Sequence, residues 1–234
     1  MLIRKASQLS SMRRVGAVAA EVLAEALSLF REGAATGEID EAVAVVLERQ
    51  GARSAPRLVY GFPGSICASL NNEAAHGIPG PRRLTAGDLV NLDLAVELDG
   101  YYADCAVSVA LEPAGETELR IAAAARGFAV LRDLGGHGVG RAPHEAPEHL
   151  ECYDNTDSST RYEEGRVMAV ELFLSTGDSH CELAEDGWTL ATRPGNLVAQ
   201  AEHTILVRQG PPEILTLGAA SGLRSVFATA AEAK

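Results

Sequence analysis

The dipeptide Asp99-Gly100 is the feature that most constrains the fold of this chain. It stands between two apolar stretches, residues 89–98 and 101–109. An Asp-Gly pair tolerates the positive φ that both central residues of a two-residue hairpin turn require. We therefore predict an antiparallel hairpin in which the residues on either side of the turn face each other.

The predicted hairpin brings two aspartates onto one face of a sheet. In this register Asp93 lies opposite Ala106, and the alternation of strand side chains puts Asp104 on the face of Asp93. The carboxylates are then diagonal neighbours, with backbones about 7–8 Å apart, and can converge on one ion. Apolar residues flank both, and a buried carboxylate without a partner costs several kcal/mol, so a cation or a proton is required. The alternative is the solvated polar face of an ordinary hairpin.

Three more candidate metal ligands, later in the chain, add to this acidic pair. Glu171 in VMAVELFL and Glu202 in LVAQAEHTILV are single acids in apolar strands, where a charged side chain is rarely buried without a partner. His137 lies in GGHGVG, whose glycines let the backbone bring the imidazole close to a crowded centre. Two Asp, two Glu and one His match the charge of two divalent ions.

The apolar spacing also predicts the order of the elements. One helix is expected over residues 12–32 and a second from Thr36, as its N-cap, to Gly51. A third is expected over residues 117–134. Further strands are predicted over 167–174, 188–192 and 197–207. The order indicates an α+β domain of two related halves, with two helices in the first half and one in the second.

Composition excludes several classes of partner. The chain has 20 Lys and Arg against 32 Asp and Glu, a formal net charge of −12, so nucleic acids and anionic membranes would be repelled over most of its surface. The N-terminus has no apolar stretch of signal-peptide length, and no segment reaches the length of a membrane span. We therefore expect a cytoplasmic protein without nucleic-acid or membrane partners. Free thiols are expected at the widely spaced Cys67, Cys105, Cys152 and Cys181.

Five segments together resemble a known family. They are FPGSICASLNNEAAHGIP, GDLVNLDLAVELDGYYADCAVS, GGHGVGRAPHEAP, VMAVELFLSTG and DGWTL followed by NLVAQAEHTILV. In residue type and order they resemble the type I methionine aminopeptidases, which have the pita-bread fold. The resemblance covers residues 10–216 of one domain that spans residues 1–234, with a C-terminal tail over 217–234.

The resemblance implies a peptidase site with two metal ions. Asp93, Asp104, His137, Glu171 and Glu202 would be the ligands, with Asp104 and Glu202 bridging the ions. The ions would lower the pKa of a bridging water, so that hydroxide is available near neutral pH. Glu171 would also move a proton between that water and the leaving amine. Carboxylates with one imidazole favour Mn(II) or Fe(II), with Co(II) as a laboratory substitute.

Two histidines and an apolar pocket complete the implied site. His144 would stabilise the developing oxyanion and His76 would contact the scissile amide. Without the resemblance, His76 is typical of a turn and His144 of an exposed loop. The side chain of the cleaved methionine would lie against Phe62, Cys67, His76 and Trp188, although Phe62 and Trp188 taken alone are typical of core packing.

The sequence departs from the family pattern in its pocket and in its length. Pro143 replaces the usual aromatic residue, and Leu172-Phe173 replaces the Pro-Met that usually follows the catalytic glutamate. The segment between the second aspartate and the histidine ligand is shorter, which corresponds to the loss of one helix in the second half. The sheet surface uncovered by that loss is expected to be covered by the tail 217–234 or by a second subunit in a homodimer.

The leading interpretation is a metalloaminopeptidase that removes the N-terminal residue, expected to be Met, from peptides or nascent proteins. One alternative is a relative that hydrolyses a different amide in a specialised pathway, which the altered pocket favours. The other is a pita-bread protein that binds metal without catalysis. Such relatives lose ligands, whereas this chain keeps the whole set.

Overall fold

A computed structural model describes residues 1–122, 127–156, 159 and 161–217. The helices are α1 (Ala6–Ser28), α2 (Thr36–Arg49), α3 (Ala55–Tyr60) and α4 (Glu116–Ala122). The strands of the first half are β1 (Arg53–Ser54), β2 (Cys67–Leu70), β3 (Glu73–Ala75), β4 (Leu89–Leu98) and β5 (Tyr101–Ala110). The later strands are β6 (Ala129–Val130), β7 (Gly136–Gly138), β8 (Glu145–Leu150), β9 (Val167–Ser175), β10 (Glu182–Leu183), β11 (Leu190–Ala191), β12 (Val198–Arg208) and β13 (Gly210–Ile214).

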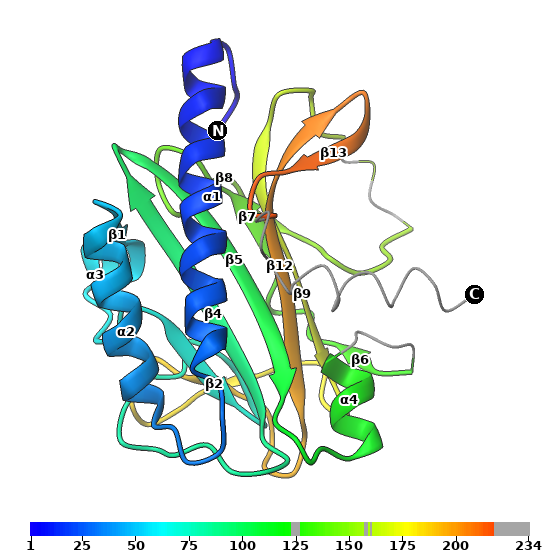
Figure 1. The fold of residues 1–234 in the computed structure, drawn as a ribbon. Helices are drawn as coiled ribbons and strands as arrows, with labels where there is room; N and C mark the ends of the chain where they lie inside the picture. The colour runs from blue at the N-terminus through cyan, green and yellow to red at the C-terminus, as the bar shows by residue number, and fades with distance from the viewer. Residues whose placement is uncertain (123–126, 157–158, 160, 218–234) are drawn as a thin grey trace.

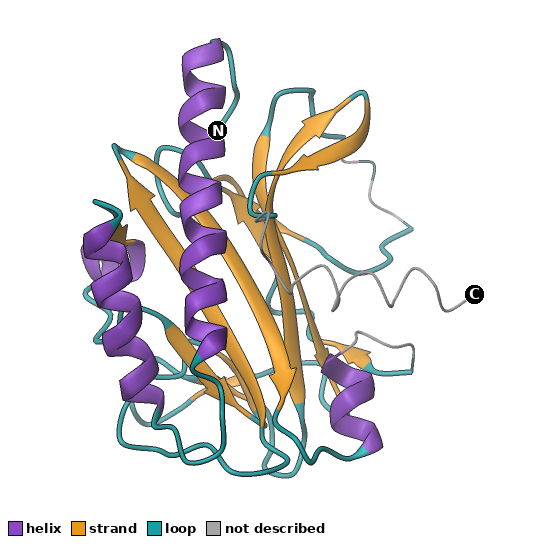
Figure 2. Cartoon of the chain, viewed as in Figure 1, coloured by secondary structure: helices purple, strands orange, loops and turns teal. Residues whose placement is uncertain are grey.

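One large antiparallel sheet organises the described part of the chain. Its main path runs β1-β4-β5-β12-β9-β7-β8, while β2, β13 and β6 pair with β4, β12 and β9. A small separate sheet has the order β10-β11-β3. The long helices α1 and α2 lie side by side against one face of the large sheet, and the shorter α4 lies near its other end (Figures 1 and 2).

The predicted hairpin is confirmed in its register as well as in its position. Strands β4 and β5 pair over their whole length, Leu98 faces Tyr101, and Asp93 faces Ala106. Asp99 at the turn has a φ of 52°. The turn dipeptide therefore placed every side chain of the hairpin on its correct face, as the period of two requires.

The first helix starts earlier than predicted. It begins at Ala6 rather than at residue 12, because the side-chain oxygen of Gln8 accepts hydrogen bonds from the backbone N–H groups of Arg4 (2.8 Å) and Lys5 (3.0 Å). These N–H groups would otherwise lack partners next to the helix start. The helix ends at Ser28, before the predicted residue 32.

The predicted N-cap of the second helix is wrong by one residue. Ala35 occupies the cap position, and Thr36 is the first helical residue. The Thr36 hydroxyl donates to the carbonyl of Gly80 (3.2 Å) and accepts from its N–H (2.9 Å). The Thr36 hydroxyl is therefore hydrogen-bonded to a loop distant in sequence and is not available to cap the helix.

The predicted helix over residues 117–134 is confirmed at its start and wrong at its end. Within the described residues, α4 covers only Glu116–Ala122, and Ala129–Val130 forms β6, which pairs with β9. Gly127 between them has a φ of 103°, a conformation that glycine adopts readily and that does not continue a helix. Pairing with β9 therefore overrides the helical apolar spacing of this segment.

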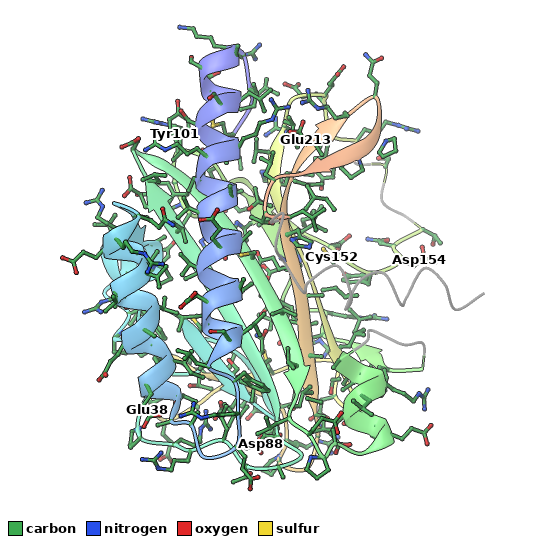
Figure 3. All side chains as sticks on the ribbon, viewed as in Figure 1. Glu38, Asp88, Tyr101, Cys152, Asp154 and Glu213 are labelled. Carbon is green, nitrogen blue, oxygen red and sulfur yellow. The ribbon has the colours of Figure 1, made fainter. Side chains whose placement is uncertain are left out.

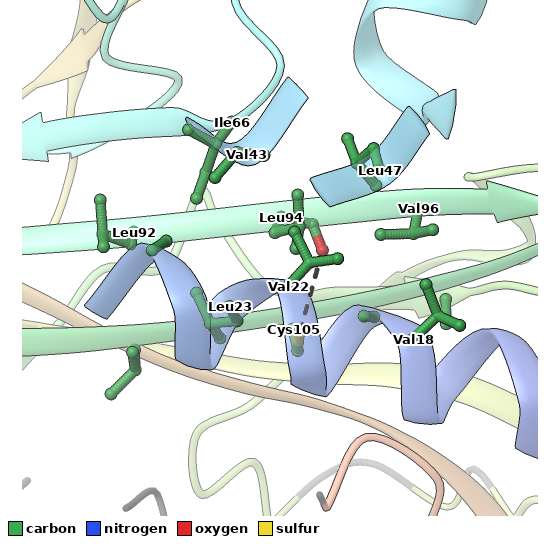
Figure 4. Close-up of a cluster of buried hydrophobic side chains, with 14 of the residues drawn as sticks. Val18, Val22, Leu23, Val43, Leu47, Ile66, Leu92, Leu94, Val96 and Cys105 are labelled. Atoms are coloured by element: carbon green, nitrogen blue, oxygen red, sulfur yellow. Dashed lines mark hydrogen bonds between the residues drawn. The ribbon is translucent and has the colours of Figure 1, made fainter. Parts of the chain in front are cut away.

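The helices pack on the sheet through apolar side chains. Val22 and Leu23 of α1 lie over Leu94 and Cys105 of the hairpin, as Figure 4 shows. Burial of one such side chain stabilises the fold by about 1.5–3 kcal/mol. Because successive side chains of β4 alternate between its faces, Asp93 faces the side of the sheet opposite to the helices.

The β12–β13 hairpin is tied to α1 by charge and by close packing. Glu213, labelled on β13 in Figure 3, pairs with Arg13 of α1 (2.6 Å) and with Arg208 of β12. Beyond β13, the chain passes close to Gly16 of α1, where an added methyl carbon would lie 2.4 Å from the carbonyl oxygen of Leu215. The helix therefore has room only for glycine at this point.

Gly16→Ala is expected to lower the free energy of unfolding by about 1–3 kcal/mol, because the added methyl must displace the backbone at Leu215. This outcome opposes the higher helix propensity of alanine. Urea denaturation measures the effect. Gly210→Ala is the control, since a methyl there meets nothing within 4 Å. Unchanged or increased stability of the Gly16 variant would contradict the packing.

The described residues also bear on the predictions for the cysteines, for membrane-spanning helices and for the C-terminal tail. All four cysteines are free, as predicted, with Cys67 and Cys105 buried. In the described ranges, the structure contains no helix that is both long enough and apolar enough to cross a membrane. The predicted tail lies outside the described residues except for Leu217.

Candidate active site

The five predicted metal ligands converge on the face of the sheet opposite to the helices. They come from five adjacent strands of the path, and the register sets Glu202 beside Glu171 on one side and Ala106 on the other. Atoms able to bind a metal on Asp104, His137 and Glu202 lie within 4.8 Å of one another. His137 Nε2 is 3.9 Å from Glu171 Oε1. The fifth residue, Asp93, lies diagonally from Asp104 across the hairpin.

The chemistry of this cluster fits a divalent cation. Asp104 Oδ1 and Glu202 Oε1 are buried and have no hydrogen-bond partner among the described residues. A buried carboxylate oxygen in that situation needs a cation or a proton. His137 Nδ1 lies 3.1 Å from the carbonyl of Gly138, so its N–H is used there and the lone pair of Nε2 faces the carboxylates. Oxygen atoms with one imidazole form the donor set that hard divalent ions prefer.

The electrostatics of the cluster agree with this fit. Burial, followed by the charge of Asp104, raises the pKa of Asp93 to about 8. Burial raises the pKa of Asp104 to about 6. The pKa values of Glu171 and Glu202 are raised well above the usual range by burial and then by the neighbouring carboxylates. The protein therefore brings together more negative charge than it compensates with its own groups.

The two accessory histidines lie at the edge of the same cluster. The ring of His144 lies 3.8 Å from that of His137 between centroids, and its Nδ1 is 2.8 Å from the hydroxyl oxygen of Tyr60. Burial, followed by the neighbouring imidazoles, lowers the pKa of His144 to about 4, so this side chain is neutral at pH 7. His76 adopts a φ of 56° and lines the same cavity as His144 and Asp93.

An apolar cavity of about 640 Å³ opens onto this cluster. The four predicted substrate-binding residues, Phe62, Cys67, His76 and Trp188, all line it. The rings of Phe62 and Trp188 meet edge to face at 5.3 Å between centroids. Burial raises the pKa of Cys67 well above its usual value, so the side chain stays an uncharged thiol. The cavity is thus lined by aromatic rings and a thiol, and by carboxylates where it meets the cluster.

The residues that depart from the family pattern also lie at the site. Pro143 lines the apolar cavity beside His144. Phe173 lines a second hollow of about 150 Å³, which His137, His144 and Glu171 also line. The two hollows share His76, Asp93 and His144. They therefore meet at the cluster from two sides.

Sequence reasoning missed two residues that contact the predicted site. Gln200 is buried, and its side-chain nitrogen lies within 3.4 Å of carboxylates from Asp93, Glu171 and Glu202. Its position two residues before Glu202, on the same strand face, was the available signal. Tyr60 offered no such signal, because its partner His144 is 84 positions away in the chain.

Comparisons with known proteins agree with this geometry. Residues 10–126 match the model of metallopeptidase family M24. The chain is 34% identical to methionine aminopeptidase 2 of Bacillus subtilis, over 92% of this chain and 99% of that protein. The crystal structure of methionine aminopeptidase from Rickettsia prowazekii is similar, with a TM-score of 0.86 and 30% identity over 93% of this chain and 100% of that one. That of Thermotoga maritima has a TM-score of 0.85 and 27% identity over 92% and 99%.

These relatives confirm the predicted fold, since structures of this family superpose on nearly the whole described chain. They also agree with the α+β pita-bread architecture, with its large antiparallel sheet and helices on one face. The likeness extends over almost the full length of the compared proteins. The chain belongs to the methionine aminopeptidase family of the M24 metallopeptidases.

Proposed function

We propose that this metalloaminopeptidase removes the N-terminal methionine of peptides or nascent proteins in the cytoplasm, with two divalent ions held by Asp93, Asp104, His137, Glu171 and Glu202. The observation that carries the proposal is the pair of unpartnered, buried carboxylate oxygens on Asp104 and Glu202 beside an apolar cavity. When bound, the ions supply a nucleophile by lowering the pKa of a coordinated water. Mn(II) and Fe(II) suit the donor set best.

The chain's own groups would perform the remaining tasks. Glu171, whose pKa is raised by burial and by neighbouring carboxylates, can take up a proton and deliver it to the leaving amine. The neutral His144 would donate a hydrogen bond to the oxygen on which negative charge develops. His76, which lines both hollows, would contact the amide that is cleaved.

The two hollows suggest how a peptide is oriented. The larger cavity, with Phe62, Cys67 and Trp188, would hold the unbranched thioether side chain of the first residue. The smaller hollow on the other side of His76 would then receive the residue that follows. In this orientation the first peptide bond would lie at the carboxylate cluster, and the longer part of the substrate would remain outside.

Tyr60→Phe is expected to lower kcat by about threefold to tenfold with little change in KM, the effect of losing one hydrogen bond that orients His144. Steady-state cleavage of a Met-Ala peptide measures both constants. Tyr162→Phe serves as the control for loss of a hydroxyl elsewhere. A Tyr60 variant with wild-type kcat would show that His144 is oriented by other contacts.

A mixed peptide library tests the proposed specificity. The chain is loaded anaerobically with Fe(II), Mn(II) or Co(II), and the N-terminal residues that it releases are identified by mass spectrometry. Metal-dependent release of Met alone is expected. Release of a different residue would instead show that Pro143 and Phe173 have changed the pocket, and intact peptides in the presence of bound metal would point to a different amide substrate.

A further inference from the structure

A row of buried polar side chains crosses three neighbouring strands next to the carboxylate cluster. Asn91 on β4, Ser108 on β5 and Gln200 on β12 are each at most 2% exposed. Asn91 is two residues before Asp93, and Gln200 is two residues before Glu202, so each shares a strand face with its acidic neighbour. The sheet thus places a row of neutral hydrogen-bonding groups beside a row of acids.

The side-chain amide nitrogen of Gln200 faces three carboxylates at once. It lies 2.9 Å from Glu171 Oε2, 3.3 Å from Glu202 Oε2 and 3.4 Å from Asp93 Oδ2. These acids come from three different strands, β9, β12 and β4. The two N–H groups of the amide are shared among the three oxygens, with the shortest contact to Glu171, so one donor group attracts all three carboxylates.

The rest of the row fixes which way the Gln200 amide points. Asn91 Nδ2 donates to Gln200 Oε1 at 2.5 Å, and the Ser108 hydroxyl donates to Asn91 Oδ1 at 3.4 Å. Ser108 Oγ also accepts from the backbone N–H of Gln200 at 2.8 Å. Turning the amide over would set its NH₂ against that of Asn91 and its oxygen against the carboxylates. Only one orientation therefore satisfies the network.

We infer that Gln200 is a positioning residue for the metal site, because its amide holds Asp93, Glu171 and Glu202 at the spacing that cations require. A lysine or arginine here would neutralise part of the ligand charge, whereas a neutral amide orients the carboxylates and leaves their full charge for the ions. The inference rests on the proposed function in one respect, namely that these acids bind metal. It adds that metal affinity depends on a residue outside the predicted ligand set.

Calorimetric titration of the metal-free chain with Mn(II) tests this role without using activity. Gln200→Met keeps the length of the side chain and removes the donor. We expect it to weaken Mn(II) binding by about 10-fold to 100-fold, the usual effect of losing a group that orients metal ligands. Gln209→Met, an exposed substitution in the turn after β12, is the matched control and should bind as the wild type does.

Asn91→Ala provides a second variant that keeps Gln200 itself. The Asn91 side chain hydrogen-bonds to Gln200 and Ser108, so a change in Mn(II) affinity would reach the carboxylates through the Gln200 amide. We expect a loss of about 5-fold or more, accompanied by a changed Mn(II) electron paramagnetic resonance spectrum. If Gln200→Met does not fold, the Asn91 variant decides by the same criterion.

The outcomes separate this inference from the proposed function. Wild-type Mn(II) binding together with a loss below about fivefold in the folded variants would overturn the positioning role and leave the metal site standing. A wild-type chain that takes up no Mn(II), Fe(II) or Co(II) would overturn both. Weakened binding in the Gln200 and Asn91 variants, with the Gln209 control unchanged, supports the inference.

Discussion

Glu171→Gln is expected to lower kcat by about 10²–10⁴-fold, the range in which a positioned proton-transfer group contributes to catalysis. Glutamine keeps the shape of the side chain but can neither accept the proton of the attacking water nor pass it to the leaving amine. Stopped assays with a Met-Ala peptide and saturating Mn(II) measure the change. Glu182→Gln on the exposed strand β10 is the matched control and should keep the wild-type kcat.

The same substitution should increase the stability of the metal-free chain, although it lowers kcat. Glu171 is buried beside Asp93 and Asp104, and its ionised form is disfavoured, as its raised pKa shows. A neutral glutamine removes one of these buried charges, so the free energy of unfolding at pH 8 in EDTA should increase. A variant that keeps more than a tenth of the wild-type kcat, or a metal-free variant less stable than the wild type, would contradict the role assigned to Glu171.

Removal of metal is expected to abolish activity and to make stability fall as pH rises from 6.5 to 8. The pKa of Asp93 is raised to about 8 in the folded chain, whereas an unfolded aspartate titrates near 3.8. Between these values the folded state binds more protons than the unfolded state. Its stability therefore declines with rising pH, by up to about 1.4 kcal/mol per pH unit for each proton retained. Glu171 and Glu202, also raised, add to the decline.

The histidines limit the pH range of this prediction. The pKa values of His144 and His203 are lowered to about 4, mainly by burial, so they add stability as pH rises to 6.5, and a fading part of this effect continues above it while the unfolded imidazoles lose their remaining protons. Above pH 6.5 the protons retained by the three acids outweigh this opposition. Asp104, with a pKa of about 6, has lost most of its contribution by then.

Thermal unfolding in EDTA and in excess Mn(II) across pH 6.5–8 measures both parts of the prediction. Mn(II) should raise Tm and reverse or flatten the pH slope, since the ions stabilise the ionised carboxylates. Asp93→Asn in EDTA should flatten the slope as well, because its amide cannot titrate. A metal-free chain whose Tm rises over this range would show that the folded carboxylates retain no protons and that other groups of the protein compensate their charge.

The site could be predicted from the sequence wherever the geometry is local. The turn at Asp99-Gly100 sets the hairpin register, and with it the relation between Asp93 and Asp104, because a strand period of two leaves no freedom once the turn is fixed. Glu171 and Glu202 were recognisable as single acids in apolar strands, and the register of β9 and β12 brings them side by side.

Interactions between distant parts of the chain could not be predicted in this way. The segment after α4 has helical apolar spacing, yet Ala129–Val130 pairs with β9, which is a property of the sheet and not of the segment. Gln200 looked like an ordinary polar residue in a strand, because its importance depends on Asp93 and Glu171, which two other strands bring beside it next to Glu202 of its own strand. Tyr60 became relevant only when α3 was placed next to the loop that carries His144.

Anomalous X-ray diffraction from crystals grown with Mn(II) tests the central claim most directly, because it locates the ions without reference to any substrate. Two manganese peaks are expected within bonding distance of Asp93, Asp104, His137, Glu171 and Glu202, with Asp104 and Glu202 contacting both ions. Manganese bound elsewhere, or a cluster that stays free of manganese while the wild-type chain cleaves peptides, would contradict the proposed active site.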